Sequence, residues 1–187
     1  MKVLDGTLKG LLIIEPDIFK DKRGFFFETF HEERYRQSGI DSIFIQDNVS
    51  CSVQRALRGL HYQHPHAQDK LIQALSGEIF DVAVDIRRES PTFGLWMGVR
   101  LSDRNKSQIY IPKGFAHGFC VLSETAHVMY KCTDFYAPDS ERGILWCDGD
   151  LGIEWPVKAP IISGKDSNFP LLKDIPAELL PAYEANS

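Results

Sequence analysis

The chain has 187 residues, with 21 Lys and Arg against 26 Asp and Glu, so its formal net charge is −5. The length suits one domain, and a hydrophobic fraction of 43% is ordinary for a globular fold. Basic residues scattered among acidic ones do not form the clustered positive surface that nucleic acids and anionic lipids require, so we expect neither as a partner.

The N-terminal segment carries charges from its second position onward. Lys2, Asp5 and Lys9 interrupt the apolar stretch that a signal peptide needs, and no run in the chain approaches ~18 apolar residues. We therefore expect a cytoplasmic protein. Residues 1–14 are expected to form an N-terminal strand or arm that can pair with a partner's sheet across a two-fold axis.

Short segments rich in Val, Ile, Phe, Tyr and Thr follow, and breakers separate them, which is typical of antiparallel strands. In chain order, strands are expected over 11–14, 24–30, 43–47, 78–86, 94–101, 108–111 and 128–133. The clearest is 78–86, where apolar Phe80 and Val82 alternate with Asp81 and Asp85.

Helical signals are few. Residues 31–37, ended by Gly39, and a short segment around 177–180 can form helices, but neither can carry a core. The fold class is therefore all-β: two packed antiparallel sheets or a closed jelly-roll barrel, with a few short peripheral helices. We expect one domain over 1–187, with 173–187 as a C-terminal tail whose last stretch, 181–187, is frayed.

The cysteines show no Cys-x-x-Cys spacing and lie in apolar or strand-like segments, so we expect buried free thiols. They are Cys51, Cys120, Cys132 and Cys147.

Two segments concentrate residues that can do chemistry. Residues 58–70, RGLHYQHPHAQDK, hold three of the six histidines, which indicates a metal site or a proton-transfer site because histidine titrates near neutral pH. Residues 111–119, IPKGFAHGF, bend at one Pro and two Gly and present His117 from a tight turn.

The second segment resembles a motif of the cupin superfamily, whose fold is a jelly roll. The first cupin motif has His-x-His, then Glu, then Gly; here His64 and His66 are followed by Lys70 and Gly77 at the same spacing. An ammonium has no lone pair for a metal and repels it, so we expect neither a metal nor a cofactor.

Six strings in order closely resemble the dTDP-4-dehydrorhamnose 3,5-epimerase family, from about Leu11 to Leu172. They are RGLHYQ (58–63), GEIFDVAVDIR (77–87), SPTFG (90–94), PKGFAHGF (112–119), YKCT (130–133) and GIEWP (152–156). The resemblance implies a homodimeric isomerase of dTDP-L-rhamnose biosynthesis. Its substrate would be dTDP-4-dehydro-6-deoxy-D-glucose, epimerised at carbons 3 and 5 to dTDP-4-dehydro-L-rhamnose.

That chemistry needs a base, a group that stabilises the enolate formed next to the 4-keto group, and an acid on the opposite face. The resemblance implies His61 as the base, Asp166 as the carboxylate that orients it, and Tyr130 as the acid. Lys70, in the place of the metal-binding acid, would stabilise the enolate charge.

The resemblance also implies a set of substrate-binding residues, with arginines for the diphosphate and Tyr136 stacked on the thymine. The set is Arg23, Glu28, Gln46, Asn48, Arg58, Lys70, His117, Tyr136, Glu141 and Lys165. Phe25–Phe27 are expected in the core, with an edge toward the nucleotide. His64 and His66 are expected to be exposed and to have no catalytic role.

Arg58 and His61 are three residues apart, so regular alternation would place them on opposite faces of a strand. The mechanism needs both near the substrate. Because Gly59 permits a bulge or kink, we predict an irregularity between Arg58 and His61.

The sequence is compatible with three alternatives. One is a monofunctional 3- or 5-epimerase of a dTDP-4-keto-6-deoxy sugar, since sequence separates one-carbon from two-carbon enzymes poorly. Another is a metal-dependent cupin oxygenase or isomerase with His61, His64, His66 and His117 as ligands. The third is a non-catalytic cupin that binds sugar nucleotides through Arg23 and Arg58.

Overall fold

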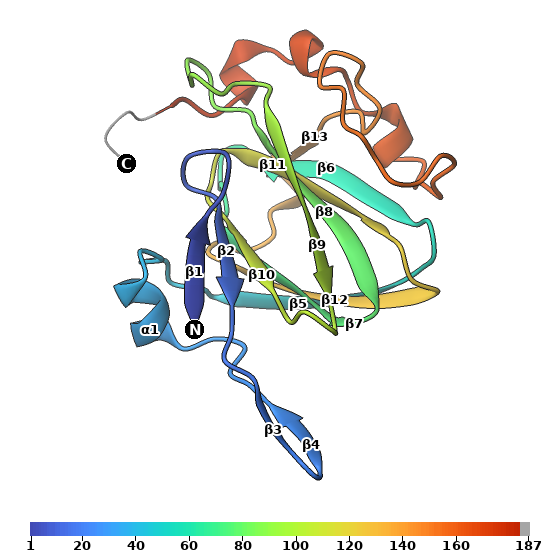
Figure 1. Cartoon of the computed structure of the whole chain (residues 1–187). Coiled ribbons are helices and arrows are strands. Elements are labelled where there is room, and N and C mark those ends of the chain that lie inside the picture. The colour runs from blue at the N-terminus through green and yellow to red at the C-terminus, as the bar shows by residue number, and fades with distance from the viewer. Residues whose placement is uncertain (184–187) are drawn as a thin grey trace.

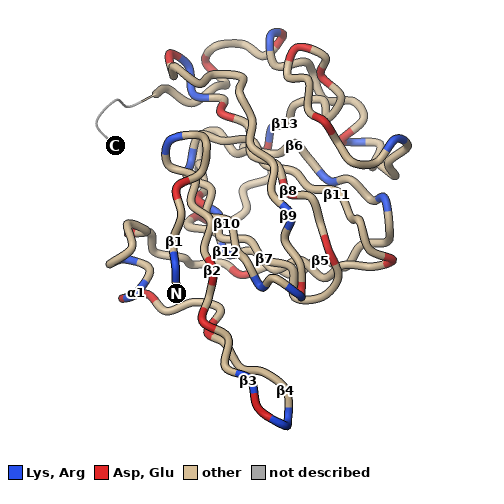
Figure 2. The backbone as a smooth tube through the Cα atoms, viewed as in Figure 1, with Lys and Arg blue, Asp and Glu red and all other residues tan. Residues whose placement is uncertain are grey.

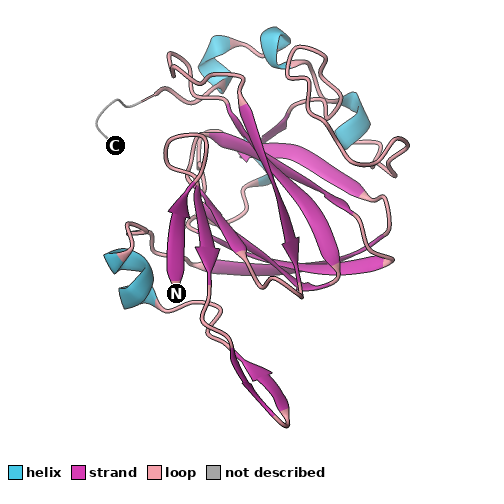
Figure 3. Ribbon diagram, in the orientation of Figure 1, coloured by secondary structure: helices cyan, strands magenta, loops and turns pink. Residues whose placement is uncertain are grey.

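The computed structural model describes residues 1–183, and strands dominate it (Figure 3). The strands are β1 (Lys2–Asp5), β2 (Leu12–Glu15), β3 (Phe19–Asp21), β4 (Gly24–Phe26), β5 (Gln46–Val53), β6 (Leu57–Gln63), β7 (Lys70–Ser76), β8 (Glu78–Asp85), β9 (Trp96–Ser102), β10 (Gln108–Ile111), β11 (Phe115–Val121), β12 (Thr125–Cys132) and β13 (Glu141–Gly143). The helical elements are α1 (Glu32–Gln37) and the 3-10 turns η1 (Pro138–Ser140), η2 (Asp166–Asn168), η3 (Leu172–Asp174) and η4 (Ala177–Leu179). The all-β prediction is confirmed.

Two antiparallel sheets face each other as a jelly roll (Figure 1). The six-stranded sheet has the order β1-β2-β10-β7-β12-β5, and the five-stranded sheet has the order β13-β6-β11-β8-β9. Strands β3 and β4 form a separate hairpin that projects from the barrel (Figure 1). The C-terminal 3-10 turns lie beyond the five-stranded sheet (Figure 1).

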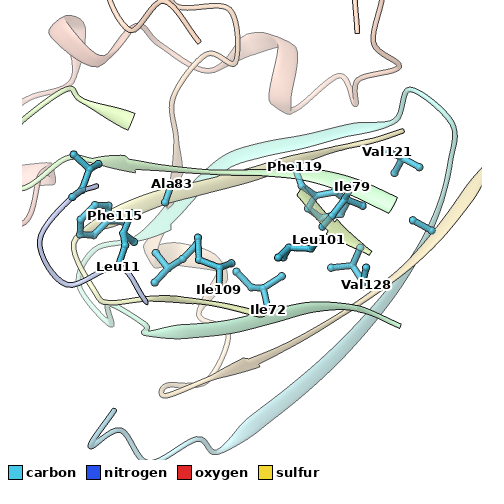
Figure 4. Close-up of a cluster of buried hydrophobic side chains, with 14 residues drawn as sticks. Leu11, Ile72, Ile79, Ala83, Leu101, Ile109, Phe115, Phe119, Val121 and Val128 are labelled. Carbon is cyan, nitrogen blue, oxygen red and sulfur yellow. The ribbon is translucent and has the colours of Figure 1, made fainter. Parts of the chain in front are cut away.

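The main core fills the space between the sheets (Figure 4). Ile72 and Val128 come from the six-stranded sheet, and Ile79 and Phe119 come from the five-stranded sheet. Strand β8 is buried on both faces, because Val82 packs outward in a second cluster with residues of the C-terminal segment. This double burial places the alternating apolar and acidic residues of β8 inside the protein.

The expected helix over 31–37 forms as α1, over Glu32–Gln37. Gly39 follows with a φ of +91°, a conformation that glycine adopts without strain, and its N–H bonds the Arg36 carbonyl. Tyr35 anchors the helix, since its hydroxyl lies 2.6 Å from Gln108 Oε1 on β10. The turn expected around 177–180 is the 3-10 turn η4.

Some strand bounds differ from the prediction. The strand predicted over 43–47 instead runs over Gln46–Val53. The sequence did not show these bounds, because the inward-facing residues Asn48, Ser50 and Ser52 are polar and the strand lacks an alternation of apolar inward and polar outward residues. Strands β6, β7 and β11 were not predicted, since they are buried along most of their length and show no period of two. The expected strand over 24–30 stops at Phe26.

Both ends of the described chain are held by backbone pairing. β1 pairs with β2 of the same chain, with Lys2 opposite Glu15, and lies at the edge of its sheet. Pro181 accepts a hydrogen bond from Arg88 N at 2.8 Å, and Tyr183 N donates to the Arg88 carbonyl at 3.0 Å. The prediction of a frayed end is therefore wrong for 181–183, and residues 184–187 lie outside the described part.

Two predictions about burial are corrected. Cys120 and Cys132 are buried, but Cys51 and Cys147 are exposed. Phe25 and Phe26 are not core residues, because they lie on the projecting hairpin and are 56% and 66% exposed.

Acidic and basic residues are interspersed over the backbone (Figure 2). Within residues 1–183, no helix has the length and apolar character needed to cross a membrane.

Candidate active site

A cavity of about 390 Å³ is lined by strands of both sheets. From the six-stranded sheet it is lined by Gln46, Asn48, Ser50, Lys70, Tyr130 and Cys132. From the five-stranded sheet it is lined by Arg58, His61, Tyr62, Gln63, His117, Phe119 and Glu141, and from connecting segments by Gln68 and Tyr136. Nine of the residues predicted for the site therefore share one cavity.

An irregularity in β6 brings Arg58 and His61 to the same cavity. Arg58 lies opposite Phe119 and His61 lies opposite His117, so three steps along β6 match two steps along β11. Gly59 makes this possible with a φ of +118°, and a Cβ there would lie 2.6 Å from Gly118 Cα. The predicted irregularity between Arg58 and His61 is confirmed.

His61 is paired with a buried carboxylate. Its Nε2 lies 2.9 Å from Asp166 Oδ1, and Gly59 N donates to Asp166 Oδ2 at 3.1 Å. Burial by itself raises the pKa of Asp166, but the hydrogen bonds and the nearby His61 outweigh burial, and the pKa lies below its usual value. An ionised Asp166 favours the tautomer with a proton on Nε2, which leaves the Nδ1 lone pair of His61 free to act as a base.

His117 is paired in the same way on the neighbouring strand. Its Nε2 lies 2.9 Å from Asp81 Oδ2, and Asp81 is 0% exposed. The sequence motif pointed to His117 but not to Asp81. Asp81 could have been found from its place in the strand pattern, because it is an acidic residue on the same face of β8 as the core residues Ile79 and Ala83.

Lys70 begins β7 and lies opposite Cys132 of β12. Burial lowers the pKa of Lys70, while Cys132, Asp81 and Glu141 act in the opposite direction. A partly desolvated ammonium interacts more strongly with a developing negative charge than an ammonium in water.

Tyr130 comes from β12 of the six-stranded sheet, opposite Asn48 of β5, so it lies on a different wall from His61. Burial raises the pKa of Tyr130 above its usual value. The phenol is therefore protonated at neutral pH and can donate a proton.

A polar chain at the rim connects residues predicted to bind substrate. The Tyr136 hydroxyl lies 2.5 Å from Glu141 Oε2, and Lys165 forms an ion pair with the same carboxylate. Tyr136 N donates to Gln46 Oε1 at 2.9 Å, and Gln46 Nε2 donates to Asn48 Oδ1 at 3.0 Å. The Tyr136 ring itself is 53% exposed, which leaves an aromatic surface available for stacking.

Three predicted substrate-binding residues are not part of the lining of this cavity: Lys165, which is paired with the lining residue Glu141, and Arg23 and Glu28, which lie on other elements. Arg23 follows β3 at the turn of the projecting hairpin, with its side chain 91% exposed and 2.5 Å from Asp21 Oδ2. Glu28 follows β4 and forms an ion pair with Arg34 of α1.

The histidines of the segment 64–66 do not line the cavity. His66 is exposed, as predicted, with Nδ1 at 3.3 Å from Asp134 Oδ2. His64 is only half-exposed, which corrects its prediction.

The donor set does not fit the metal centre of a metal-binding cupin. Lys70 stands where the acidic ligand would be, and His61 and His117 each direct Nε2 at an aspartate. Within residues 1–183, no three His, Cys, Asp or Glu side chains are grouped so that they could hold a metal ion. We therefore derive no step through a metal.

Comparisons with known proteins agree with this geometry. The model of the dTDP-4-dehydrorhamnose 3,5-epimerase family matches residues 5–174. A dTDP-4-dehydrorhamnose 3,5-epimerase from Shigella flexneri is 53% identical over 170 residues, covering 90% of this chain and 94% of the relative.

Two solved structures bear on the sugar chemistry. The Legionella pneumophila 3,5-epimerase RmlC, in complex with dTDP-4-keto-L-rhamnose, is 53% identical with a TM-score of 0.96, covering 98% of this chain and 99% of that one. ChmJ from Streptomyces bikiniensis, a 3'-monoepimerase in complex with dTDP-quinovose, is 38% identical with a TM-score of 0.88, covering 95% and 91%.

Proposed function

Because the chain belongs to the dTDP-4-dehydrorhamnose 3,5-epimerase family, we propose that it epimerises dTDP-4-dehydro-6-deoxy-D-glucose at carbons 3 and 5 to dTDP-4-dehydro-L-rhamnose. The enzyme is an isomerase of dTDP-L-rhamnose biosynthesis. One observation carries the proposal: His61, which is paired with Asp166 of η2, and Tyr130 come from different sheets and line one cavity together with Lys70.

The proposed reaction is a proton transfer next to the 4-keto group. His61 takes the proton from the carbon, and the bonding electrons move onto the carbonyl oxygen to form an enolate. The Lys70 ammonium stabilises the enolate charge, and the Tyr130 phenol returns a proton to the carbon from the opposite face. Exchange with solvent then removes the proton from His61 and restores the one lost by Tyr130, so the same groups can act at the second carbon.

The other residues that line the cavity, together with Lys165 beside Glu141, bind the nucleotide sugar. Tyr136 stacks on the thymine, and Arg58 and Lys165 bind the diphosphate through charge-assisted hydrogen bonds. The other groups hydrogen-bond the base, the sugars or the phosphates; they are Gln46, Asn48, His117 and Glu141.

The active form is a homodimer. The outer face of β5 exposes Val49 and Val53, with 60% and 56% of their surface accessible, and Leu75 of β7 is 40% exposed. An apolar sheet face of this kind is typical of an interface with another protein, and a second copy of this chain is the partner that the family resemblance implies.

In that dimer, the hairpin β3–β4 reaches the cavity of the partner. This arrangement accounts for Arg23 and Glu28, which lie away from the cavity lining of their own chain. It also gives the exposed rings of Phe25 and Phe26 a surface to pack against.

The enzyme works in the cytoplasm without a metal or cofactor, and neither nucleic acid nor a membrane is a partner. The thiols of Cys51 and Cys147 support this location, because exposed free cysteines are suited to a reducing compartment.

A monofunctional epimerase is the second candidate function. The similarity to the 3'-monoepimerase ChmJ favours it, although the relatives with 53% identity are 3,5-epimerases. A binding protein without catalysis is the weaker alternative, because it would have no use for the His61–Asp166 pair in the same cavity as Tyr130.

Incubation of the protein with dTDP-4-dehydro-6-deoxy-D-glucose in deuterated water, followed by NMR, tests the function. Deuterium at both carbons 3 and 5 is the expected result, because each inversion returns a proton from solvent. Deuterium at one carbon alone selects the monofunctional epimerase, and deuterium at neither carbon contradicts the enzymatic assignment.

A further inference from the structure

Lys106 is a buried lysine that the proposed reaction does not use. It lies in the loop between β9 and β10 and is 8% exposed. Its ammonium nitrogen lies 4.1 Å from the centre of the Phe25 ring and 5.6 Å from the centre of the Phe27 ring. Both distances are within the range of a cation–π interaction, so Lys106 connects the barrel to the projecting hairpin β3–β4.

Lys131 provides a comparison, because it also lies over an aromatic ring. Its ammonium is 5.2 Å from the centre of the Phe30 ring and is paired with the carboxylate of Asp47 at 2.8 Å. Within residues 1–183, no carboxylate forms an ion pair with Lys106. Fixing a lysine side chain costs up to about 2 kcal/mol of conformational entropy, and the ring contacts offset this cost for Lys106. The side chain of Lys106 is therefore committed to the hairpin.

The loop that carries Lys106 is held by its own hydrogen bonds. Asn105 Oδ1 accepts hydrogen bonds from Ser102 N at 3.0 Å and from Ser107 N at 3.1 Å. Asn105 Nδ2 donates to the Arg100 carbonyl at 2.9 Å. Lys106 N itself donates to the Ser102 carbonyl at 2.9 Å. The ammonium is thus presented to the hairpin from a well-ordered part of the barrel, as a positioning role requires.

The rings of the hairpin divide between its two faces. Phe25 and Phe27 have ring centres 6.1 Å apart and share the face that meets Lys106. Phe19 and Phe26 lie opposite each other on β3 and β4, with ring centres 6.5 Å apart, and share the other face. One face is therefore anchored to the barrel of its own chain, while the other remains exposed.

We propose that Lys106 is a positioning residue of the hairpin β3–β4. Its ammonium holds the rings of Phe25 and Phe27 and thereby fixes the direction of the hairpin. Arg23 precedes Phe25 by two residues and Glu28 directly follows Phe27, so both side chains that meet the substrate in the proposed dimer move with these rings. The proposal rests on the proposed function, in which the hairpin completes a substrate-binding cavity.

Steady-state kinetics with the nucleotide sugar test the positioning role. Lys106→Met keeps a flexible side chain and removes the charge, so KM should rise about tenfold, within the range of a desolvated cation–π interaction. The value of kcat should change by less than about threefold, because His61 and Tyr130 line the cavity of the barrel. Lys106→Arg keeps a cation over the rings and should restore most of the wild-type KM. Lys158→Met, at an exposed lysine of the C-terminal segment, is the control and should leave KM unchanged.

A double-mutant cycle assigns the effect to the ring contact. Phe25→Leu removes the nearer ring and leaves Lys106 in place. If the two groups act through each other, Lys106→Met should raise KM much less in the Phe25→Leu protein than in the wild type. Phe19→Leu, on the other face of the hairpin, is the control background, in which Lys106→Met should keep its full effect. Additive effects of Lys106→Met and Phe25→Leu would overturn the proposal, and Lys106→Gln replaces Lys106→Met if the latter does not fold.

Limited digestion with trypsin measures the anchoring of the hairpin without the reaction. Lys20, Lys22 and Arg23 are exposed cleavage sites near the hairpin tip, and the initial rate of cleavage there should rise at least about threefold in Lys106→Met but not in Lys106→Arg. A wild-type protein without epimerase activity would contradict the proposed function, whatever the cleavage rates. An active Lys106→Met protein with the wild-type KM, or a wild-type cleavage rate in Lys106→Met, would overturn the role of Lys106 alone.

Discussion

His61 and His117 lie directly opposite each other on β6 and β11, and each directs Nε2 at an aspartate. The two pairs differ in their surroundings. Asp166 accepts a further hydrogen bond from the backbone, whereas one oxygen of Asp81 has none within residues 1–183. The same side-chain pairing therefore occurs in two different surroundings on neighbouring strands, and only the pair at His61 is completed by a backbone N–H donor.

Asp166→Asn is expected to lower kcat by about 10²–10⁴ while KM changes little. The amide cannot stabilise the imidazolium that forms when His61 takes a proton, and it no longer selects the Nε2–H tautomer. Steady-state kinetics measure the effect. Asp148→Asn is the control, because Asp148 is also buried but, within residues 1–183, accepts hydrogen bonds only from backbone N–H groups, those of Asp150 and Leu172. Equal losses in both variants would mean that Asp166 is merely structural.

The ionisation of Asp85 makes the stability of the folded protein depend on pH. Burial by itself raises the pKa of Asp85, but hydrogen bonds from Arg87, Ser90 and Thr92 outweigh burial and lower it. Because the pKa is lower in the folded state, the ionised carboxylate stabilises the folded protein at pH values above the unfolded-state pKa of 3.8. This stabilisation is lost as the pH falls through the folded-state pKa.

Asp85→Asn should therefore cost about 3 kcal/mol of unfolding free energy at pH 7, and the difference from wild type should shrink below pH ~4. Thermal unfolding followed by circular dichroism at several pH values provides the measurement. A difference that stays constant down to pH ~3 would show that the ionised carboxylate is not the source of the stability.

Strand β6 has a backbone irregularity that requires a glycine. Its irregularity at Gly59 sends Arg58 and His61 to the same cavity, and the close approach of β11 leaves no room for a side chain. Function at two positions of one strand thus depends on a glycine between them that has no side chain to contact the substrate.

Gly59→Ala is expected to cost at least about 3 kcal/mol of unfolding free energy, because the added methyl would meet the β11 backbone and the φ of +118° is unfavourable for alanine. Urea denaturation measures this cost. Gly164→Ala is the matched control, since no atom lies within 4 Å of the Cβ position, and it should change stability by less than about 0.5 kcal/mol. Similar stabilities for the two variants would refute the steric argument.

At the scale of the whole molecule, the hairpin β3–β4 stands out because it pairs with no other strand within residues 1–183 of its own chain. It projects from the barrel (Figure 1). Its side chains Phe19, Phe25 and Phe26 are exposed. Rings left in water are unfavourable, and a partner chain that covered them would stabilise the proposed dimer.

Mixing two inactive variants tests the exchange of hairpins. Arg23→Ala removes the hairpin cation and His61→Ala removes the base. In a heterodimer, the cavity that keeps His61 would receive an intact hairpin from its partner, so a refolded equimolar mixture should recover about one quarter of wild-type activity. No recovery would mean that each hairpin serves its own cavity, and a monomer by light scattering at micromolar concentration would contradict the dimer itself.

Several features could be predicted from the amino-acid pattern. The alternation in 78–86, the glycine at 59 and the strings around His61, His117 and Tyr130 led to the fold class, the irregular strand and most of the cavity. These features depend on the type and spacing of neighbouring residues. Glycine is the residue that most readily adopts a positive φ, and the spacing of motif residues is read directly from the sequence.

Other features depended on contacts between distant segments. The bounds of β5, the exposure of Phe25 and Phe26, and the pairing of Asp81 with His117 all depend on which segments of the chain pack together. A residue's burial is set by what packs against it, and one sequence does not state which strand will be its neighbour.

The order of amino acids alone established an acidic, strand-rich chain with a lysine where a metal-binding cupin has an acidic residue. It did so because charge, strand periodicity and ligand chemistry are properties of individual residues and their spacing. The packing of the chain in three dimensions set which aspartate pairs with which histidine, and it placed Arg23 outside the cavity of its own chain. Those outcomes depend on the register and packing of strands from different parts of the chain, where electrostatic interactions act through space rather than along the sequence.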